Sequence, residues 1–205
     1  MRRETPVVEK ASQIALREAP AVWSIETLTG RLVELSGCGA AAQLSLAFTL
    51  VREAQAHGDR AAWVTDRGST FFPPDAAASG VDLDALPVVF APDAAAAARA
   101  ADKLVRSGGF GLVVLDLVGA GGPTPAPLLS RLAGLAQQHA AAVLFLTEKP
   151  PEEASLSSLV SLRCEALRRD ASGGEFLCLV RALKDKRRGP GWTVAEVRRG
   201  PLGLR

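Results

Sequence analysis

The chain has 205 residues, of which 48% are hydrophobic and 22% charged, and its formal net charge is +2. These proportions are typical of a soluble globular protein and argue against a disordered or membrane-embedded chain. No apolar run approaches the roughly 20 residues of a membrane span, and the first residues lack the apolar core of a signal peptide. We therefore expect a cytoplasmic protein without a membrane contact.

The charges and cysteines narrow the range of functions further. Residues 163–205 carry 11 Lys or Arg against 5 Asp or Glu, a net of +6, whereas the rest of the chain has a net of −4. A basic end can meet nucleic acid or an acidic protein surface, although a solvated basic face is an equally good interpretation. The three cysteines, Cys38, Cys164 and Cys178, are scattered and predict neither a disulfide framework nor a metal site.

Hydrophobic periodicity predicts alternating helices and strands up to residue 150. Residues 1–21 form a predicted amphipathic helix, and residues 23–30 a connector. Strands are then expected over 32–35, 61–65, 86–91, 111–118 and 142–147, and helices over 41–56, 93–107 and 128–139. The run GLVVLDLV is almost wholly apolar, as in a strand that is buried on both faces of a parallel sheet.

After residue 150 the pattern changes to three predicted strands, over 159–166, 175–182 and 192–198. The segments DASGGE and KDKRRGPG separate them and suit hairpin turns. The predicted fold class is therefore α/β, a mostly parallel twisted sheet flanked by helices and extended by C-terminal antiparallel hairpins. We expect an N-terminal helix over residues 1–22 and a single domain over residues 23–205.

The stretch GRLVELSGCGAAAQLSLA has the strand–loop–helix layout of a nucleotide-phosphate loop. A working loop reads GxxxxGK[ST], in which the lysine neutralises phosphate charge and the hydroxyl holds Mg²⁺. Here the corresponding positions are Gly37, Gly39, Ala42, Gln43 and Leu44. Gln43 supplies no positive charge, and Leu44 cannot ligate a metal. An ordinary strand–turn–helix is the alternative interpretation of this stretch.

Two further features carry possible chemistry. Asp116 lies in the C-terminal part of a predicted buried strand, where phosphate-loop proteins place the carboxylate that orients Mg²⁺, although aspartates also commonly cap helices or end strands. The segment RALKDKRRGPGW crowds a predicted hairpin with cations that could contact DNA or a partner: Lys184, Lys186, Arg187 and Arg188. Neither histidine stands in a metal or nucleophile motif, and we predict no catalytic residue, metal ligand or cofactor.

Taken in order, these segments resemble the core of the bacterial recombinase RecA over roughly 150 residues. GRLVEL with its loop, WVTD, and ADKLVRSGGFGLVVLDLVGA, which contains Asp116, are similar to its nucleotide motifs. LVRALKDKRRGPG resembles its late hairpin, where a Lys-x-Lys motif faces a neighbouring subunit's nucleotide, and Lys184 and Lys186 stand at that motif. The resemblance implies a RecA-like core domain without the recombinase's C-terminal domain.

The departures from RecA matter equally. Gln43-Leu44 replaces the essential Lys-Thr, and Asp66-Arg67 stands where a catalytic glutamate is expected. A short, inactivated RecA-like chain resembles the ImuA family of bacterial mutagenesis cassettes. That resemblance implies a non-catalytic accessory protein of the SOS response, which contacts RecA, ImuB or both, with the error-prone polymerase assembly, in translesion DNA synthesis. The alternatives are a SulA-like cell-division inhibitor, a DNA-binding paralogue that uses the basic hairpins, and an ATPase with a substitute lysine.

Overall fold

The fold is built on one eight-stranded sheet with the order β3-β2-β4-β5-β1-β6-β7-β8. The computed structural model describes residues 22–39, 41–69, 71–171 and 175–199, so the predicted helix over residues 1–21 lies outside the described residues. The strands are β1 (Leu32–Gly37), β2 (Ala61–Thr65), β3 (Val88–Phe90), β4 (Leu112–Asp116), β5 (Ala142–Glu148), β6 (Leu162–Asp170), β7 (Glu175–Asp185) and β8 (Thr193–Arg199). The first six strands of the chain run parallel to one another, and β7 and β8 follow as antiparallel strands. The predicted fold class is confirmed.

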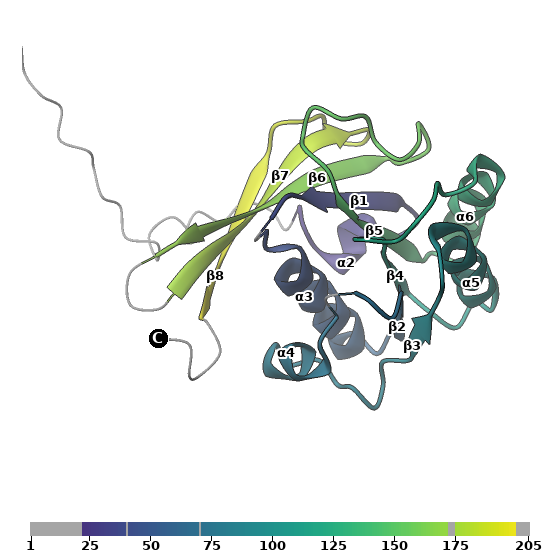
Figure 1. Ribbon diagram of the computed structural model, residues 1–205, viewed down its shortest axis with the longest axis horizontal. Helices are drawn as coiled ribbons and strands as arrows, with labels where there is room; N and C mark the ends of the chain where they lie inside the picture. Colours follow the sequence, from purple (N-terminus) through teal and green to yellow (C-terminus); the bar gives the residue numbers. More distant parts are fainter. Residues whose placement is uncertain (1–21, 40, 70, 172–174, 200–205) are drawn as a thin grey trace, which may run out of the picture.

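Helices cover both faces of the parallel part of the sheet (Figure 1). One face carries α2 (Ile25–Leu28), α3 (Gln43–Ala56) and α4 (Pro73–Ala78), and the other carries α5 (Ala94–Arg106) and α6 (Ala126–Gln138). On the α3 face, Phe48 and Trp63 pack with ring centroids 5.3 Å apart. The central strands β1, β2 and β4 are buried along their whole length, which explains their nearly continuous apolar sequences.

The antiparallel strands leave the body of the molecule. β6, β7 and β8 extend beyond the helices as a projecting ribbon (Figure 1). The pairing of β6 with β7 covers nine residues of β6 and shifts register once, between Arg163 and Cys164. In the described part of the chain, no helix is both long enough and apolar enough to cross a lipid bilayer.

The structure departs from the sequence-based elements mainly in two segments. Residues 23–30, predicted as a connector, contain α2, which begins with a capping box between Ser24 and Thr27. The turn-rich segment DRGSTFFPPD leads into α4, whose first helical residue is Pro73. Proline is favoured at that position because the amide hydrogen it lacks would have no partner within the helix. Both helices are shorter than two turns, so hydrophobic periodicity gives almost no signal for them.

Candidate functional site

The predicted phosphate loop forms the connection between β1 and α3. Gly39 has a φ of +61°, a conformation that strongly favours glycine. The Ala41 amide donates to the Gly39 carbonyl over 2.8 Å, so a tight turn uses one of the loop's donors internally. Ala42 caps α3 without a side-chain hydrogen bond. The strand–loop–helix shape is therefore present, and the predicted loop residues lie together.

The Gln43 side chain occupies the interior of this loop. Its Nε2 donates to the Leu35 carbonyl over 3.0 Å and to the Thr147 carbonyl over 2.7 Å, and the residue is 9% exposed. The amide thus ties the start of α3 to the ends of β1 and β5. A Cβ added at Gly37 would lie 2.5 Å from the Ala41 Cβ and 3.1 Å from the Gln43 Cδ. Glycine is required at position 37 because protein side chains pack against it.

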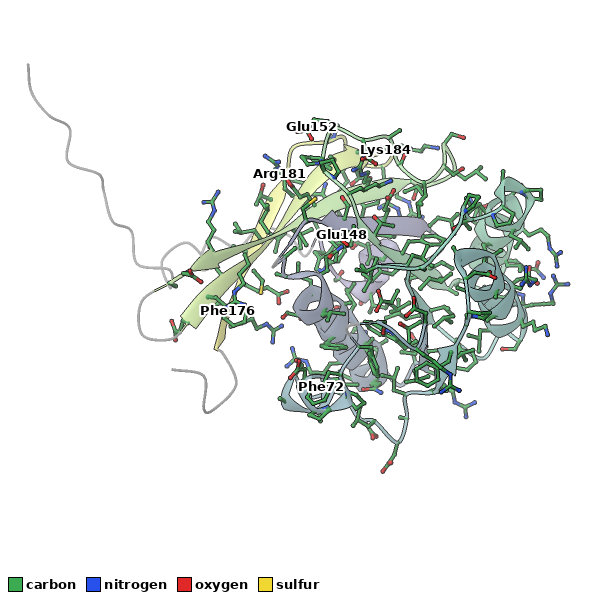
Figure 2. All side chains as sticks on the ribbon, in the orientation of Figure 1. Phe72, Glu148, Glu152, Phe176, Arg181 and Lys184 are labelled. Atoms are coloured by element: carbon green, nitrogen blue, oxygen red, sulfur yellow. The ribbon has the colours of Figure 1, made fainter. Side chains whose placement is uncertain are left out.

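A hollow of about 300 Å³ lies beside the loop, and its lining suits phosphate poorly. Its walls are Gly37, Gly39, Ala41, Gln43, Leu44, Val118, Leu146 and Glu148. Glu148, at the end of β5 (Figure 2), is the one ionisable residue among them, and its carboxylate would repel a phosphate. A nucleoside triphosphate needs a cation and a metal-binding hydroxyl here. The residues present therefore do not fit a nucleotide–magnesium complex.

Asp116 is the last residue of β4 and is 1% exposed. One carboxylate oxygen accepts from the Thr65 hydroxyl over 3.3 Å, and the other from the Val118 amide over 3.3 Å. Burial raises the pKa of Asp116 to about 6, and these two hydrogen bonds oppose the rise only in part. Asp116 lies next to the hollow beside the loop, because it is in register with Leu146 and accepts from the Val118 amide, and both of these residues line that hollow.

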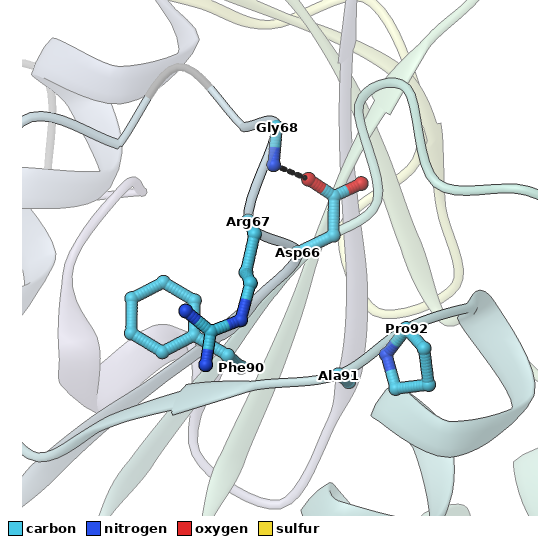
Figure 3. Close-up of a pocket in the computed structure, with 6 residues that line it drawn as sticks. All are labelled: Asp66, Arg67, Gly68, Phe90, Ala91 and Pro92. Atoms are coloured by element: carbon cyan, nitrogen blue, oxygen red, sulfur yellow. Dashed lines mark hydrogen bonds between the residues drawn. The ribbon is translucent and has the colours of Figure 1, made fainter.

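A second hollow, of about 360 Å³, lies at the carboxyl ends of β2 and β3 (Figure 3). Its lining includes Asp66 and Arg67, which stand where the resemblance leads one to expect a catalytic glutamate. The Arg67 guanidinium carbon lies 5.4 Å from the centre of the exposed Phe90 ring, within the range of a cation–π contact. Sequence analysis missed Phe90, because an aromatic residue at the end of a strand usually indicates the core.

The four basic residues predicted to contact DNA or a partner have unequal surroundings. The Lys184 Nζ donates to the Ser155 hydroxyl over 3.3 Å, and the Lys186 Nζ donates to the Ser158 carbonyl over 2.7 Å. Burial, with a smaller effect of Lys186, lowers the pKa of Lys184. Figure 2 shows Lys184 beside the loop that carries Glu152. Arg187 and Arg188 are exposed in the turn after β7.

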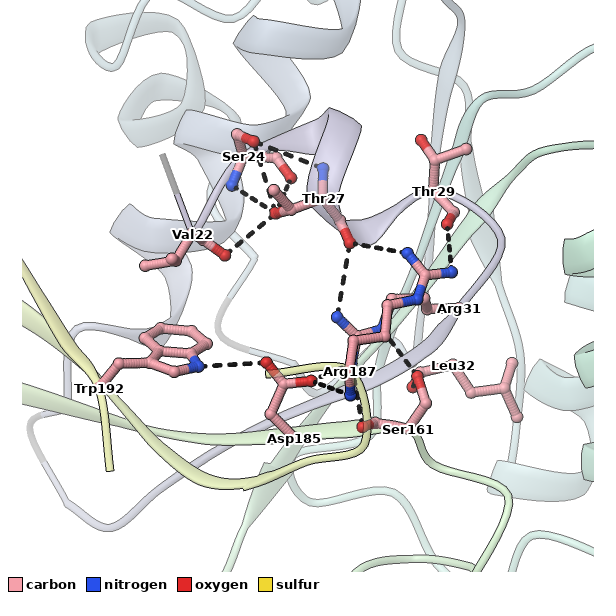
Figure 4. A network of polar contacts seen from close by, with 10 residues as sticks. All are labelled: Val22, Ser24, Thr27, Thr29, Arg31, Leu32, Ser161, Asp185, Arg187 and Trp192. Carbon is pink, nitrogen blue, oxygen red and sulfur yellow. Dashed lines mark hydrogen bonds and ion pairs between the residues drawn. The ribbon is translucent and has the colours of Figure 1, made fainter. Parts of the chain in front are cut away.

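In the same hairpin, Asp185 connects the end of β7 to Arg31, which directly precedes β1 (Figure 4). Its carboxylate pairs with the Arg31 guanidinium over 2.6 Å, and both side chains are almost completely buried. It also accepts from the Trp192 indole over 3.1 Å and from the Arg187 amide over 2.9 Å. Burial alone would raise the pKa of Asp185, but these hydrogen bonds and the Arg31 charge outweigh burial and lower it.

A buried ion pair fixes the loop that follows β5. Glu34, in the middle of β1, pairs with the Lys149 Nζ over 2.5 Å and accepts from the Thr147 hydroxyl over 3.0 Å and from the Leu156 amide over 2.9 Å. Arg163 donates to the Pro150 carbonyl over 2.8 Å. A glutamate inside the apolar run GRLVEL was the one available signal for this network. The segment of residues 149–161 is thereby held against the sheet.

The fold and the loop between β1 and α3 define the class of protein: a parallel α/β domain built around a strand–loop–helix of the phosphate-loop type. The model of the RecA N-terminal domain family matches residues 6–129, more than half of the chain, and the chain belongs to that family. The protein RecA of Salinispora tropica is 39% identical over 122 residues, which are 57% of this chain and 34% of that protein. Protein RecA of Fusobacterium nucleatum is 38% identical over 92 residues, and that of Rhodospirillum rubrum 41% over 92 residues. The matched segments span a quarter to a third of these relatives' lengths.

Proposed function

We propose that this protein is a RecA-related accessory factor that does not turn over ATP and acts through protein contacts in the bacterial DNA-damage response. Specifically, it serves error-prone translesion synthesis in the manner of the ImuA family, with RecA, ImuB or both, and the error-prone polymerase assembly, as partners. The main support is the position of Gln43, whose amide fills the phosphate loop by bonding the Leu35 and Thr147 carbonyls.

The chemistry of phosphoryl transfer explains why this observation carries weight. Catalysis of that reaction depends on positioning and on cations that neutralise the charge of the transferred group, and losing such a clamp costs several kcal/mol of transition-state stabilisation. The loop has lost both the lysine and the metal-binding hydroxyl, and Glu148 adds a negative charge to the hollow. A role through surface contacts needs none of these groups.

A surface suited to a protein partner lies around β3. Phe90 is 54% exposed, and Arg67 lies against its ring. Aromatic residues and arginine dominate the binding energy of protein interfaces. β3 is also an outermost strand of the sheet, so a partner can reach these side chains without displacing another described strand. We therefore assign the partner contact to this edge.

The experiment combines a nucleotide assay with a binding assay on the full chain. We expect Mg·ATP to leave the melting temperature unchanged and no ATP hydrolysis above background, with RecA as the positive control. We also expect RecA or ImuB encoded by the same genome to bind, and Phe90→Ala combined with Arg67→Glu to weaken that binding at least tenfold. Leu83→Ala, at another exposed apolar residue, is the matched control.

Two results would overturn the proposal. One is ATP hydrolysis that Asp116→Ala abolishes, which would restore the enzyme interpretation. The other is an absence of binding to both proteins, and cell filamentation on expression would then favour the division-inhibitor alternative.

A further inference from the structure

β8 is the second outermost strand of the sheet, and among the described residues no strand pairs with its outer edge. It pairs with β7 over seven residues, Thr193–Arg199, and no other described strand lies beside it. The opposite edge is the three-residue strand β3. Natural proteins blunt exposed edges with short strands, charged side chains, proline or bulges. β3 is short, whereas β8, with the sequence TVAEVRR, has a regular pairing and no proline, and its Glu196 and Arg198 neutralise each other as an ion pair.

The backbone groups that face outward follow from the pairing with β7. The Ala182 amide donates to the Trp192 carbonyl over 2.9 Å, and the Ala182 carbonyl accepts from the Gly191 amide over 3.0 Å, so the Trp192 carbonyl points toward β7. These groups alternate in an antiparallel ladder. Residues 194, 196 and 198 therefore bond β7, and the amides and carbonyls of Ala195, Val197 and Arg199 point away from the sheet.

The side chains of β8 are arranged so that they are complementary to those of β8 in a second copy of the chain. Glu196 and Arg198 lie two residues apart on one face and form an ion pair over 2.7 Å, with each side chain 25% exposed. Both also contact Thr49 of α3. The half-buried Ala195 and Val197 lie on the other face. The strand thus carries an acid and a base placed symmetrically about Val197.

We propose that β8 pairs antiparallel with β8 of a second copy of this chain, with the twofold axis at Val197. In this register Glu196 of each copy lies opposite Arg198 of the other, and the two Val197 side chains meet at the axis. A register centred on Glu196 or on Arg198 would place like charges opposite one another, which is destabilising. One centred on Ala195 would oppose Glu196 to Val194. Charge therefore selects the Val197 register, and the two sheets become continuous.

The test separates the contact between copies from the ion pair within each copy. In the double variant Glu196→Arg/Arg198→Glu the pair inside the chain is kept with its charges exchanged. The native protein and the double variant should each form dimers in sedimentation at about 100 µM. Mixed dimers should be at least tenfold rarer than random assortment predicts, because both charge positions then face like charges.

A second variant provides an independent check. Val197→Lys places two ammonium groups at the axis, and we expect a folded monomer with an unchanged circular dichroism spectrum. A native protein that sediments as a monomer at this concentration would overturn the proposal. So would random mixing of the native protein and the double variant, or a dimer that Val197→Lys leaves intact.

Discussion

At the scale of single residues, Asp116 shows what remains when a carboxylate at a strand end has no cation beside it. Its partners are a hydroxyl and an amide, and none of the described residues forms an ion pair with it. A buried carboxylate without a compensating charge favours its neutral form. Asp116 therefore has a pKa of about 6, and its charge is a cost to the fold above that pH.

Replacing Asp116 by asparagine should make the protein more stable at pH 8. The folded state holds its proton more tightly than the unfolded chain, whose carboxyl has a pKa of 3.8. The free energy of unfolding therefore falls as the pH rises from about 4 to about 6. A shift of this size corresponds to about 3 kcal/mol, which Asp116→Asn should recover. Urea unfolding of both proteins at pH 5 and pH 8 measures the effect.

The exposed Asp84 provides the matched control, since Asp84→Asn should leave the pH dependence as it is. If the free energy of unfolding of Asp116→Asn fell between pH 4 and pH 6 as steeply as that of the native protein, Asp116 would be ionised in the folded protein at little cost in stability.

At the scale of elements, the buried Arg31–Asp185 pair joins the start of β1 to the end of β7. Removing one member of a buried ion pair strands the other charge and costs about 3–5 kcal/mol, whereas replacing both with apolar residues is often nearly neutral. We expect Asp185→Leu to cost about that much and Arg31→Met/Asp185→Leu to recover most of it. The Trp192 indole and the Arg187 amide would still lack their acceptor, so the recovery should be incomplete.

Thermal unfolding of the three proteins measures these differences. Glu152→Leu, on an exposed acid in another loop, controls for the added apolar surface. If the double variant were no more stable than Asp185→Leu, the cost would come from the lost hydrogen bonds to Trp192 and Arg187 rather than from the stranded Arg31 charge.

The alternating elements were predictable because each central strand is an apolar run ended by polar or small residues. β2 was predicted with its observed ends, and α3, α5 and α6 within two residues at each end. The buried polar network was not predictable from local pattern. Glu34 meets Lys149 and Leu156, and Arg31 meets Asp185, more than 100 residues away along the sequence. Only the strand order brings such pairs together. The segment KDKRRGPG contains Asp185, and the sequence around it indicates only a basic turn, not a buried ion pair.

At the scale of the whole molecule, part of the positive charge of residues 163–205 is engaged within the protein. Arg163 is buried, Arg181 pairs with Glu165 and Arg198 pairs with Glu196. Lys184 and Lys186 bond the segment of residues 149–161. Of the four basic residues predicted to contact DNA or a partner, Arg188 and Arg187 are exposed, and Arg187 makes only long hydrogen bonds, to the Thr27 and Thr29 carbonyls over 3.5 and 3.4 Å.

We therefore expect weak, salt-sensitive binding of single-stranded DNA. Two phosphate contacts give a slope of about −1.4 in a plot of log affinity against log salt concentration, since each contact contributes about −0.7 for single strands. Arg187→Ala/Arg188→Ala should remove most of that dependence in fluorescence anisotropy titrations of an oligothymidine. Arg168→Ala/Arg169→Ala, at the exposed end of β6, is the matched control. A native slope steeper than about −3 would instead mean that DNA displaces residues 149–161 from Lys184 and Lys186, and the basic hairpin would then be a DNA-binding site.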